Sequence, residues 1–428
     1  MSAIVQYIIP VFYMAILAFI LTRIKWLQNA GFSKKLIVGF FIAKCLAGFA
    51  YNWVALHYIP NRGDIWPFFE DGLYLYRSFL QSPSAFFDTW SQGFRYSDLN
   101  ALSTDSGIAR SAFEIIKTFH FLLNFFTFGN LSANTVIFNF LAVLSFFYSW
   151  RFFRQQLGTQ GIWAGLLFFF LPSMFFYSSG ILKEGLVICL LCLLVPLSYK
   201  LITARLKFGL ALKWLLAMAL LAVLKFFVAI LFVFCLVLWY LLHRFAAKRW
   251  LVLSATIGIA AIIFCFSHYI NHALNFPGFL AKRQQEFLAL PAASSMPVTV
   301  ISSNPVSIIK ATPRALLNVL FKPFPGEGGK AMYLVFSAET ILFWLGIISL
   351  VWVRKKQKLS PAVSTLAIVF LVFGLLNLFI IGLIVPNIGA MMRYRSIFFP
   401  FISFALILFT GFNPDRGKIS GFFQKFFR

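Results

Sequence analysis

Acidic residues are scarce in this chain. It has 12 Asp and Glu among 428 residues, against 37 Lys and Arg, and charged residues of both signs make up only 11%. An ordinary soluble domain carries about 25% charged residues. Such a low content therefore argues against a soluble protein of this length. Seven of the twelve acids fall within one polar stretch, His57 to Ala133, so this stretch holds most of the carboxylates that could do chemistry.

Cysteine is also rare, and its five positions all lie inside apolar runs. Cys189 and Cys192 have CxxC spacing, but no cluster of other metal ligands accompanies them, so the sequence predicts packing thiols rather than a metal site or a disulfide. The chain has no P-loop, no GxGxxG motif and no convincing Ser-His-Asp arrangement. We predict no zinc site, because no HExxH context surrounds the histidines of the expected outer half, His57, His120, His268 and His272.

Apolar residues dominate instead. Hydrophobic side chains make up 61% of the chain, and 57 residues are Phe. A soluble protein of this length cannot bury so much apolar surface, whereas a bilayer solvates it. Apolar and polar residues do not alternate at every second position, as the strands of an outer-membrane barrel would require. We therefore predict an all-α fold, a polytopic transmembrane helical bundle.

Eleven apolar runs are candidate spans. Most approach the length of about 20 residues that a bilayer requires, and a few are shorter. The run Leu210–Leu242 would be about 50 Å long as one helix, too long for a hydrocarbon core of about 30 Å, so we divide it at Lys225. Phe113–Phe128 is short and carries charged residues, and we predict an amphipathic helix on the outer surface. The predicted spans are Ala3–Leu21, Leu36–Leu56, Asn134–Trp150, Gly161–Ser178, Gly185–Leu197, Leu210–Leu224, Phe226–Leu242, Leu251–Ile270, Met332–Val353, Ala362–Val385 and Ser396–Phe412.

Basic residues indicate the orientation. With these spans, 21 of the 37 Lys and Arg fall in short loops on one side, where Asp415 is the only acid. The positive-inside rule makes this side cytoplasmic. One integral-membrane domain, 1–428, then has its N-terminus outside, its C-terminus inside and two large outer loops, 57–133 and 271–331. This topology accounts for the net charge of +25 without nucleic acid, and we expect the cytoplasmic membrane of a bacterium.

The first outer loop holds the candidate catalytic residues. Asp64 follows Arg62-Gly63 just beyond the second span, and Glu70 and Asp71 precede a predicted interface helix, Leu73–Leu80. A carboxylate at the membrane surface can deprotonate a hydroxyl, or can coordinate a divalent cation beside a phosphate. Acids at this place can alternatively cap the N-terminus of a helix. We favour chemistry for Asp64 and leave both roles open for Asp71.

Two charged pairs are candidates for substrate binding. Lys183 and Glu184 lie near the outer end of the fourth predicted span, where a charge is costly unless it has an oppositely charged partner or is hydrated. They therefore line a cavity, or belong to a turn between two helices. Arg393 and Arg395 stand on the outer side, against the positive-inside pattern. Arginine binds phosphate with two parallel hydrogen bonds, although snorkelling to headgroups is the alternative.

Three further lysines enter the same interpretation. Lys225 and Lys322 would add positive charge to an outer cavity for a phosphate. Lys44 lies within the second predicted span. Its side chain either snorkels to the membrane surface or lines a cavity, and the sequence favours neither.

The motifs Gly63-Asp64 and Glu70-Asp71, followed by the two predicted helices of the first loop, resemble the GT-C superfamily of integral-membrane glycosyltransferases. The resemblance covers the topology and the first loop. In that family the acidic loop typically follows the first span, whereas here it follows the second. The resemblance implies a polyprenyl-phosphate-linked sugar donor, with Asp64, Glu70 or Asp71 as base on an acceptor hydroxyl. It also implies that Arg393 and Arg395 stabilise the departing phosphate.

Two other functions stay open. A polymerase or ligase of surface polysaccharide would share the lipid-linked substrate, but would depend more on arginines than on carboxylates. A flippase or transporter without chemistry would show discontinuous helices at the membrane midplane and two related halves. The sequence offers only Pro172 and Pro196 as breaks, and no internal repeat.

Overall fold

The computed structural model describes residues 3–59, 64–84, 86–87, 105–203, 207–270, 275–290, 294–327, 331–352 and 360–410. Within these ranges the chain is helical, without strands, which confirms the all-α prediction. Eight helices are long and apolar enough to cross a membrane, and three shorter apolar helices accompany them. The protein is therefore an integral membrane protein. The predicted count of eleven spans and their orientation stay predictions.

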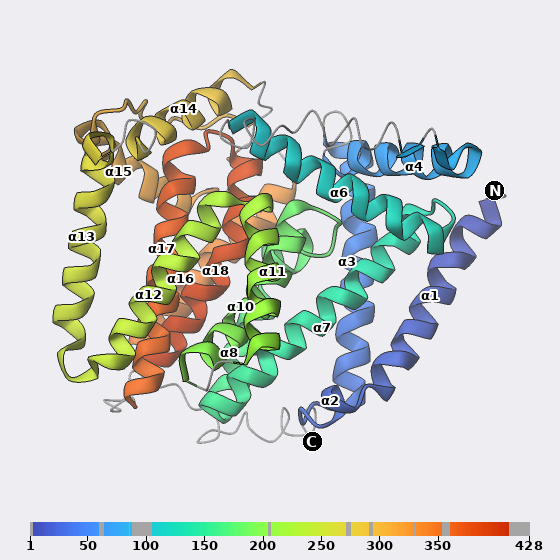
Figure 1. Ribbon diagram of the computed structural model, residues 1–428, viewed down its shortest axis with the longest axis horizontal. Coiled ribbons are helices and arrows are strands. Elements are labelled where there is room, and N and C mark those ends of the chain that lie inside the picture. The colour runs from blue at the N-terminus through green and yellow to red at the C-terminus, as the bar shows by residue number, and fades with distance from the viewer. Residues whose placement is uncertain are drawn as a thin grey trace. The chain divides into compact units, whose positions relative to one another are not determined.

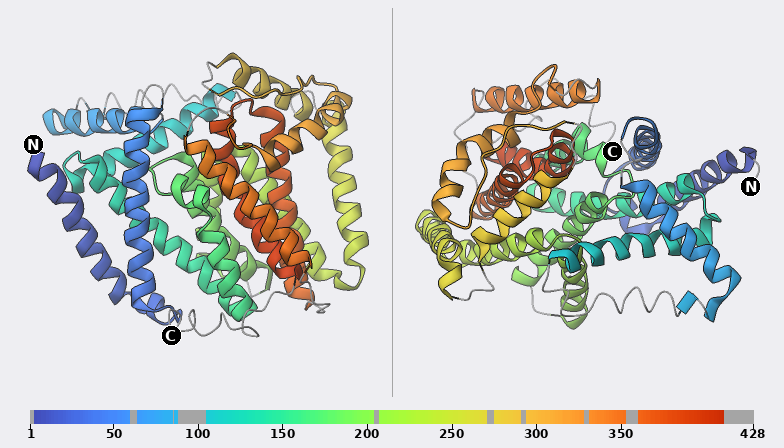
Figure 2. Two further views of the ribbon diagram at one scale, coloured as in Figure 1. Left: turned by 180° about the vertical axis from the view of Figure 1, so that it is seen from behind. Right: turned by 90° about the horizontal axis from the view of Figure 1, so that it is seen from above.

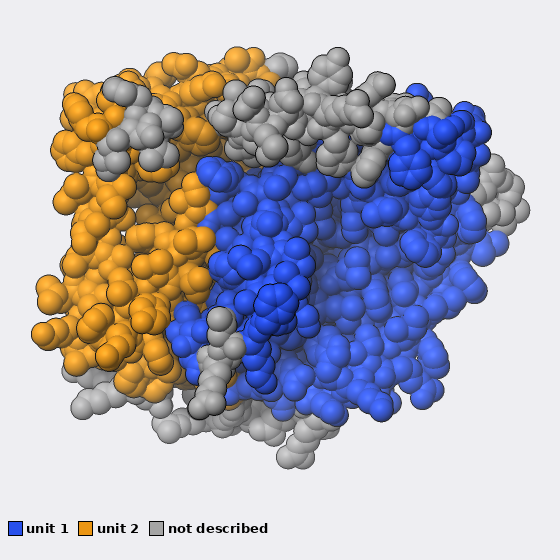
Figure 3. All heavy atoms as spheres, in the orientation of Figure 1, with its two compact units in different colours: residues 1–155, 175–229, 414–428 blue, residues 156–174, 230–413 orange. Residues whose placement is uncertain are grey.

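Several charged residues and other residues of possible functional interest lie outside the described ranges. They are Arg62, Gly63, Asp88, Asp98, Arg205, His272, the basic cluster 354–358 and the C-terminal residues from 411 onward. The described chain divides into two compact units, drawn in different colours in Figure 3. Unit 1 holds residues 1–155, 175–229 and 414–428, and unit 2 holds residues 156–174 and 230–413.

Unit 1 combines long apolar helices with two amphipathic ones. The amphipathic helices, α4 and α6, run across the ends of α3 and α7, at the opposite end from the short helix α2 (Figures 1 and 2). We call these the α4–α6 end and the α2 end of unit 1. Its elements are α1 (Ala3–Arg23), α2 (Lys25–Gln28), α3 (Lys34–Tyr58), α4 (Ile65–Gln81), α6 (Asp105–Thr127), α7 (Leu131–Leu157), α10 (Lys183–Thr203) and α11 (Phe208–Leu224).

Helix α4 packs closely against α6 through one glycine. The buried positions of α4 include Ile65, Phe68, Phe69 and Gly72, a spacing that places them on one face of the helix. A Cβ atom added to Gly72 would lie 2.6 Å from the Cβ of His120 in α6. Only the absence of a side chain therefore allows the two helices to approach so closely.

Unit 2 has a similar combination of apolar spans and surface helices. Helices α14 and α15 lie across one end of α13 and α17 (Figure 1). Helices α9 (Pro172–Tyr177) and α12 (Phe226–Arg244) contribute residues to both units. The other elements of unit 2 are α8 (Thr159–Phe169), the 3₁₀ helix η2 (Ala246–Lys248), α13 (Arg249–Ile270), α14 (Phe276–Ala289), α15 (Pro305–Phe321), α16 (Ala331–Trp352), α17 (Pro361–Ile384) and α18 (Ile388–Thr410).

The structure contains two of the expected helix breaks. The division at Lys225 is confirmed, because α11 ends at Leu224 and α12 begins at Phe226. The run Gly161–Ser178 is not one continuous helix, because the chain leaves the helix after Phe169 and re-enters it at Pro172, where the sequence offered a break. Proline lacks an N–H, and its ring clashes with the carbonyl one turn back.

In unit 2 the carboxylate of Glu339 accepts hydrogen bonds from the backbone N–H and the hydroxyl of Ser173, both at 2.7 Å.

Two predicted helix starts are also wrong. Helix α4 begins at Ile65 rather than Leu73, because Pro67 falls within its first turn, where a missing N–H leaves no bond unmade. Helix α18 begins at Ile388 rather than Ser396, so Arg393 and Arg395 lie inside the helix and not ahead of it.

Candidate functional site

The three candidate carboxylates all belong to α4 or its start. Asp64 occupies the N-cap position, and its side chain makes no capping hydrogen bond there. Glu70 and Asp71 lie within the helix, and all three side chains are exposed. The capping role considered for Asp71 is wrong, because Asp71 lies in the second turn, beyond the N–H groups that a cap would satisfy. Helix capping therefore does not explain the presence of an acid at Asp71.

Asp71 has an unusual electrostatic environment. Although Asp71 is exposed overall, its carboxyl is partly shielded from water, and this desolvation raises the pKa of the carboxyl above the ordinary value. Lys117 of α6 opposes the rise, while Glu114 and Glu70 add to it. Lys117 and Glu114 themselves form an ion pair of 2.5 Å on α6. A carboxyl with a raised pKa accepts a proton more readily near neutral pH than an ordinary aspartate does. We call Asp71, Glu114 and Lys117 the α4–α6 cluster.

Lys183, the first residue of α10, reaches the same helix. Its ammonium group lies 5.6 Å from the ring centroid of Phe68 in α4. Asp64, Phe68 and Asp71 are spaced four and three residues apart, so they lie along one face of α4. The cation of Lys183 therefore comes to the helix between the positions of the two aspartates. Glu70 points to a different side of α4 by its position in the helical repeat.

Glu184 and Lys225 form a pair in unit 1. The carboxylate of Glu184 lies 3.2 Å from the ammonium group of Lys225, and the two side chains are 4% and 10% exposed. Charge at this place in the sequence is costly unless it is paired or hydrated, and the structure pairs it. Pairing offsets the cost of holding each charge away from water. The pair joins the start of α10 to the residue between α11 and α12.

A buried polar layer beneath α4 was not anticipated. His120 is fully buried, and burial lowers the pKa of its imidazole to about 3, so the ring is neutral at physiological pH. Asn134 of α7 lies 3.4 Å from His120 Nδ1 and donates to the side-chain oxygen of Asn124 at 2.8 Å. The available signal was the spacing of His120 and Asn124, four residues apart on α6, next to an asparagine at the start of an apolar run.

Three predicted binding residues belong to unit 2. Arg395 is 1% exposed and donates to the carbonyls of Val319 and Lys322, at 3.1 and 2.6 Å, and to the hydroxyl of Thr340 at 2.8 Å. These contacts satisfy carbonyls at the C-terminal end of α15. The guanidinium of Arg393 is only partly buried and lies 5.2 Å from the ring centroid of Tyr394.

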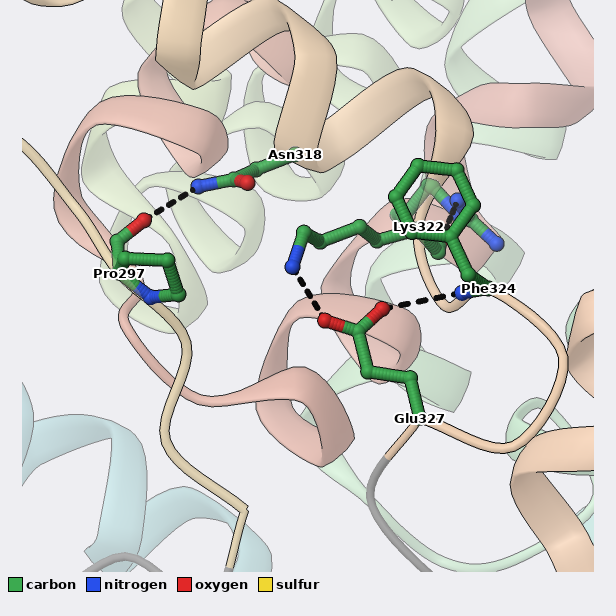
Figure 4. A network of polar contacts seen from close by, with 6 residues as sticks. Pro297, Asn318, Lys322, Phe324 and Glu327 are labelled. Atoms are coloured by element: carbon green, nitrogen blue, oxygen red, sulfur yellow. Dashed lines mark hydrogen bonds and ion pairs between the residues drawn. The ribbon is translucent and has the colours of Figure 1, made fainter.

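Lys322 has an acidic partner close in the sequence. Its ammonium group pairs with the carboxylate of Glu327, which also accepts a hydrogen bond of 3.0 Å from the backbone N–H of Phe324 (Figure 4). The same loop is fixed from the other side, where Asn318 donates to the carbonyl of Pro297 at 2.9 Å. Lys322 is therefore held in a turn stabilised by its own neighbours.

Within the described ranges, no three His, Cys, Asp or Glu side chains are grouped so that they could hold a metal ion. Comparisons with known protein families, with curated proteins and with solved structures found no match. A function is therefore inferred from the side chains of each unit. The structure brings Asp71 together with Lys117 and Glu114, and Lys183 to the same helix. Lys322 and Arg395 adjoin each other in unit 2.

Proposed function

We propose that the protein is a membrane glycosyltransferase, as its resemblance to the GT-C superfamily implies. It would move a sugar from a polyprenyl-phosphate donor to an acceptor hydroxyl at the outer face of the cytoplasmic membrane. The observation that carries this proposal is the α4–α6 cluster, in which Asp71 on an amphipathic helix lies near the Lys117–Glu114 pair of α6 and has a raised pKa. A carboxyl with a raised pKa is suited to abstract a proton from an acceptor hydroxyl.

The reaction we propose is a single displacement. The acceptor oxygen attacks the anomeric carbon, and the bond between that carbon and the phosphate oxygen breaks. Asp71 takes the proton of the acceptor hydroxyl, and the lipid phosphate leaves with the bonding electrons. Lys183, over the ring of Phe68, would offset the charge that develops on the phosphate. Lys117 would do the same while pairing with Glu114.

Among the three candidate carboxylates we now favour Asp71, whereas the sequence alone favoured Asp64. Asp64 lies at the N-cap, about two turns from Asp71 along α4. Glu70 belongs to another side of the helix. Asp71 has a raised carboxyl pKa and a cation, Lys117, on the neighbouring helix α6.

The test uses the full-length protein reconstituted into vesicles with synthetic polyprenyl-phosphate hexoses. Loss of a general base typically lowers the rate about 10²–10⁴-fold. We expect that loss of lipid-phosphate release in Asp71→Asn, with Glu70→Gln as the matched control on the adjacent residue. Equal release by wild type and Asp71→Asn would refute the assignment.

A flippase or transporter is the second candidate, and discontinuous helices favour it. Residues Ser178 to Leu182 are not helical and separate α9 from α10. Lys44 of α3 is fully buried and donates to the Ser178 hydroxyl at 2.8 Å, so its snorkelling role is wrong. Irregular backbone beside a buried charge is typical of transporter sites. Lipid translocation in vesicles that survives in Asp71→Asn but is lost in Lys44→Met would favour this candidate.

The polymerase or ligase alternative gains less support. It would depend on Arg393 and Arg395, and the guanidinium of Arg395 already binds two carbonyls and a hydroxyl within unit 2. Only Arg393 of the pair has a partly exposed side chain.

A further inference from the structure

An apolar cavity of about 400 Å³ lies in unit 1 between α7 and α10. Its lining residues recur at intervals of three or four, so each helix contributes one face. From Phe138 to Tyr148 the α7 face extends about 15 Å, half of a hydrocarbon core of about 30 Å. The cavity therefore has the length and lining that suit one hydrocarbon chain of a lipid. The residues used here are Phe138, Leu141 and Tyr148 of α7 and Leu186 and Leu193 of α10.

The cavity ends in two aromatic residues at the α2 end, and basic residues contact both of them. Trp26 and Tyr148 line it there, with ring centroids 6.3 Å apart in an edge-to-face arrangement. The exposed Lys200 donates to the Tyr148 hydroxyl at 3.2 Å. Arg151 reaches the carbonyl of Trp26 at 3.4 Å. Tryptophan, tyrosine and cations together mark the level of lipid headgroups.

The other end of the cavity has no basic residue in its lining. Phe119 of α6 and Leu186 line it. Lys183 lies one helical turn from Leu186, but its ammonium group lies over the ring of Phe68 in α4. The α2 end instead presents Lys25, Arg151 and Lys200 without a described acidic residue in α2 or in the last turns of α7 and α10. Charge complementarity therefore places a phosphate near Lys200.

We propose that this cavity binds one acyl chain of an anionic glycerophospholipid, whose phosphate is held by Lys200 and the Tyr148 hydroxyl. The lipid comes from the leaflet beside the α2 end. It packs between α7 and α10, the helix whose first residue is Lys183. This site is separate from the proposed transfer reaction, and it makes the arrangement of unit 1 dependent on the anionic lipid content of the membrane.

Native mass spectrometry of the full-length protein tests the headgroup contact. Protein released from vesicles of phosphatidylcholine and phosphatidylglycerol should retain one phosphatidylglycerol in preference to phosphatidylcholine. Lys200→Gln should weaken that retention about fivefold, the factor equal to about 1 kcal/mol for one lysine at an anionic lipid surface. Lys207→Gln, which removes an exposed basic residue beyond the cavity lining, should retain the lipid as wild type does. Equal retention of the two lipids, or a loss on Lys183→Gln instead of Lys200→Gln, would overturn the proposal.

A second measurement needs no variant and locates the acyl chain of the bound lipid. Phosphatidylglycerol with a photoreactive diazirine in one acyl chain is incorporated into the vesicles, and its cross-links are mapped by peptide mass spectrometry. We expect enrichment on residues 138–148 of α7 and 186–193 of α10 relative to the lipid-exposed helix α13. An even distribution over all apolar helices would show bulk lipid only and would contradict the proposal. Cross-links at the cavity without any sugar transfer would leave this site standing and count against the proposed function alone.

Discussion

The carboxylate of Glu184 lies 3.2 Å from the ammonium group of Lys225, and both side chains are at least 90% buried. The pair links the first turn of α10 to the single residue that separates α11 from α12. Removing one member of a buried ion pair leaves an uncompensated charge, which typically costs about 3–5 kcal/mol. The contact therefore helps to fix the start of α10, and with it Lys183.

This pair gives a direct prediction about stability. Glu184→Gln should lower the thermal midpoint of the protein in detergent, because Lys225 is left without its carboxylate. The double variant Glu184→Gln with Lys225→Met should recover most of the loss, because neither charge remains. Circular dichroism at 222 nm measures the midpoints. A double variant less stable than the single one would show that the pair is not the stabilising contact.

Asp71 should reduce stability at neutral pH. Its folded-state pKa is raised, chiefly by partial burial, so the folded state disfavours the ionised form. The folded protein loses stability as pH rises through that pKa, and Asp71→Asn should be the more stable protein at pH 7. The difference should vanish below the ordinary pKa of about 3.9, where the carboxyl is protonated in both states. Thermal midpoints of wild type and variant across pH 3.5 to 8 check this, with Glu70→Gln as control.

His120 should make the protein acid-sensitive. The unfolded imidazole binds a proton below about pH 6.5, whereas buried His120 stays neutral down to about pH 3. Stability should therefore fall with pH over this window, by up to about 1.4 kcal/mol per pH unit for one proton. His120→Gln should flatten the dependence. His57→Gln, at an exposed histidine, should leave it as in wild type. Identical pH profiles for wild type and His120→Gln would contradict the burial argument.

Substitutions of the two arginines of α18 should have different effects on stability and on activity. Arg395→Gln should lower the thermal midpoint, because each buried acceptor that loses its donor costs about 1–3 kcal/mol. Arg393→Gln should leave the midpoint nearly unchanged and, if Arg393 contacts a substrate phosphate, should raise KM for the lipid donor. Paired melting curves and kinetics distinguish the two roles. A stable Arg395→Gln protein would show that the α15 contacts are dispensable.

The sequence predicted those parts of the fold that local patterns control. The break at Lys225 followed from the length of an apolar run compared with the thickness of a bilayer, and the structure has it. The start of α4 was missed because Pro67 and the nearby acids have the composition of a loop. Proline in the first turn of a helix removes no hydrogen bond, so composition gave the wrong boundary. The start of α18 was missed because Arg395 is buried by contacts with α15, which no local pattern shows.

The candidate site was predicted only in part. Asp71, Lys183, Glu184 and Lys225 were all singled out by charge in an apolar chain, but their partners depend on how helices pack. The approach of Lys183 to Phe68 requires the position of α10 against α4, and the influence of Lys117 on Asp71 requires the crossing at Gly72. The sequence suggested only that His120 belongs to an amphipathic helix and to no zinc site. Its burial depends on α7, which contributes Asn134 from a different apolar run.

The most direct test of the proposed function is the release of lipid phosphate from synthetic polyprenyl-phosphate hexoses by reconstituted protein, measured against pH. We expect release by wild type that rises as Asp71 ionises, a loss of about 10²–10⁴-fold in Asp71→Asn, and near-normal release in Glu70→Gln. Release by Asp71→Asn at the wild-type rate with the same pH profile would contradict it.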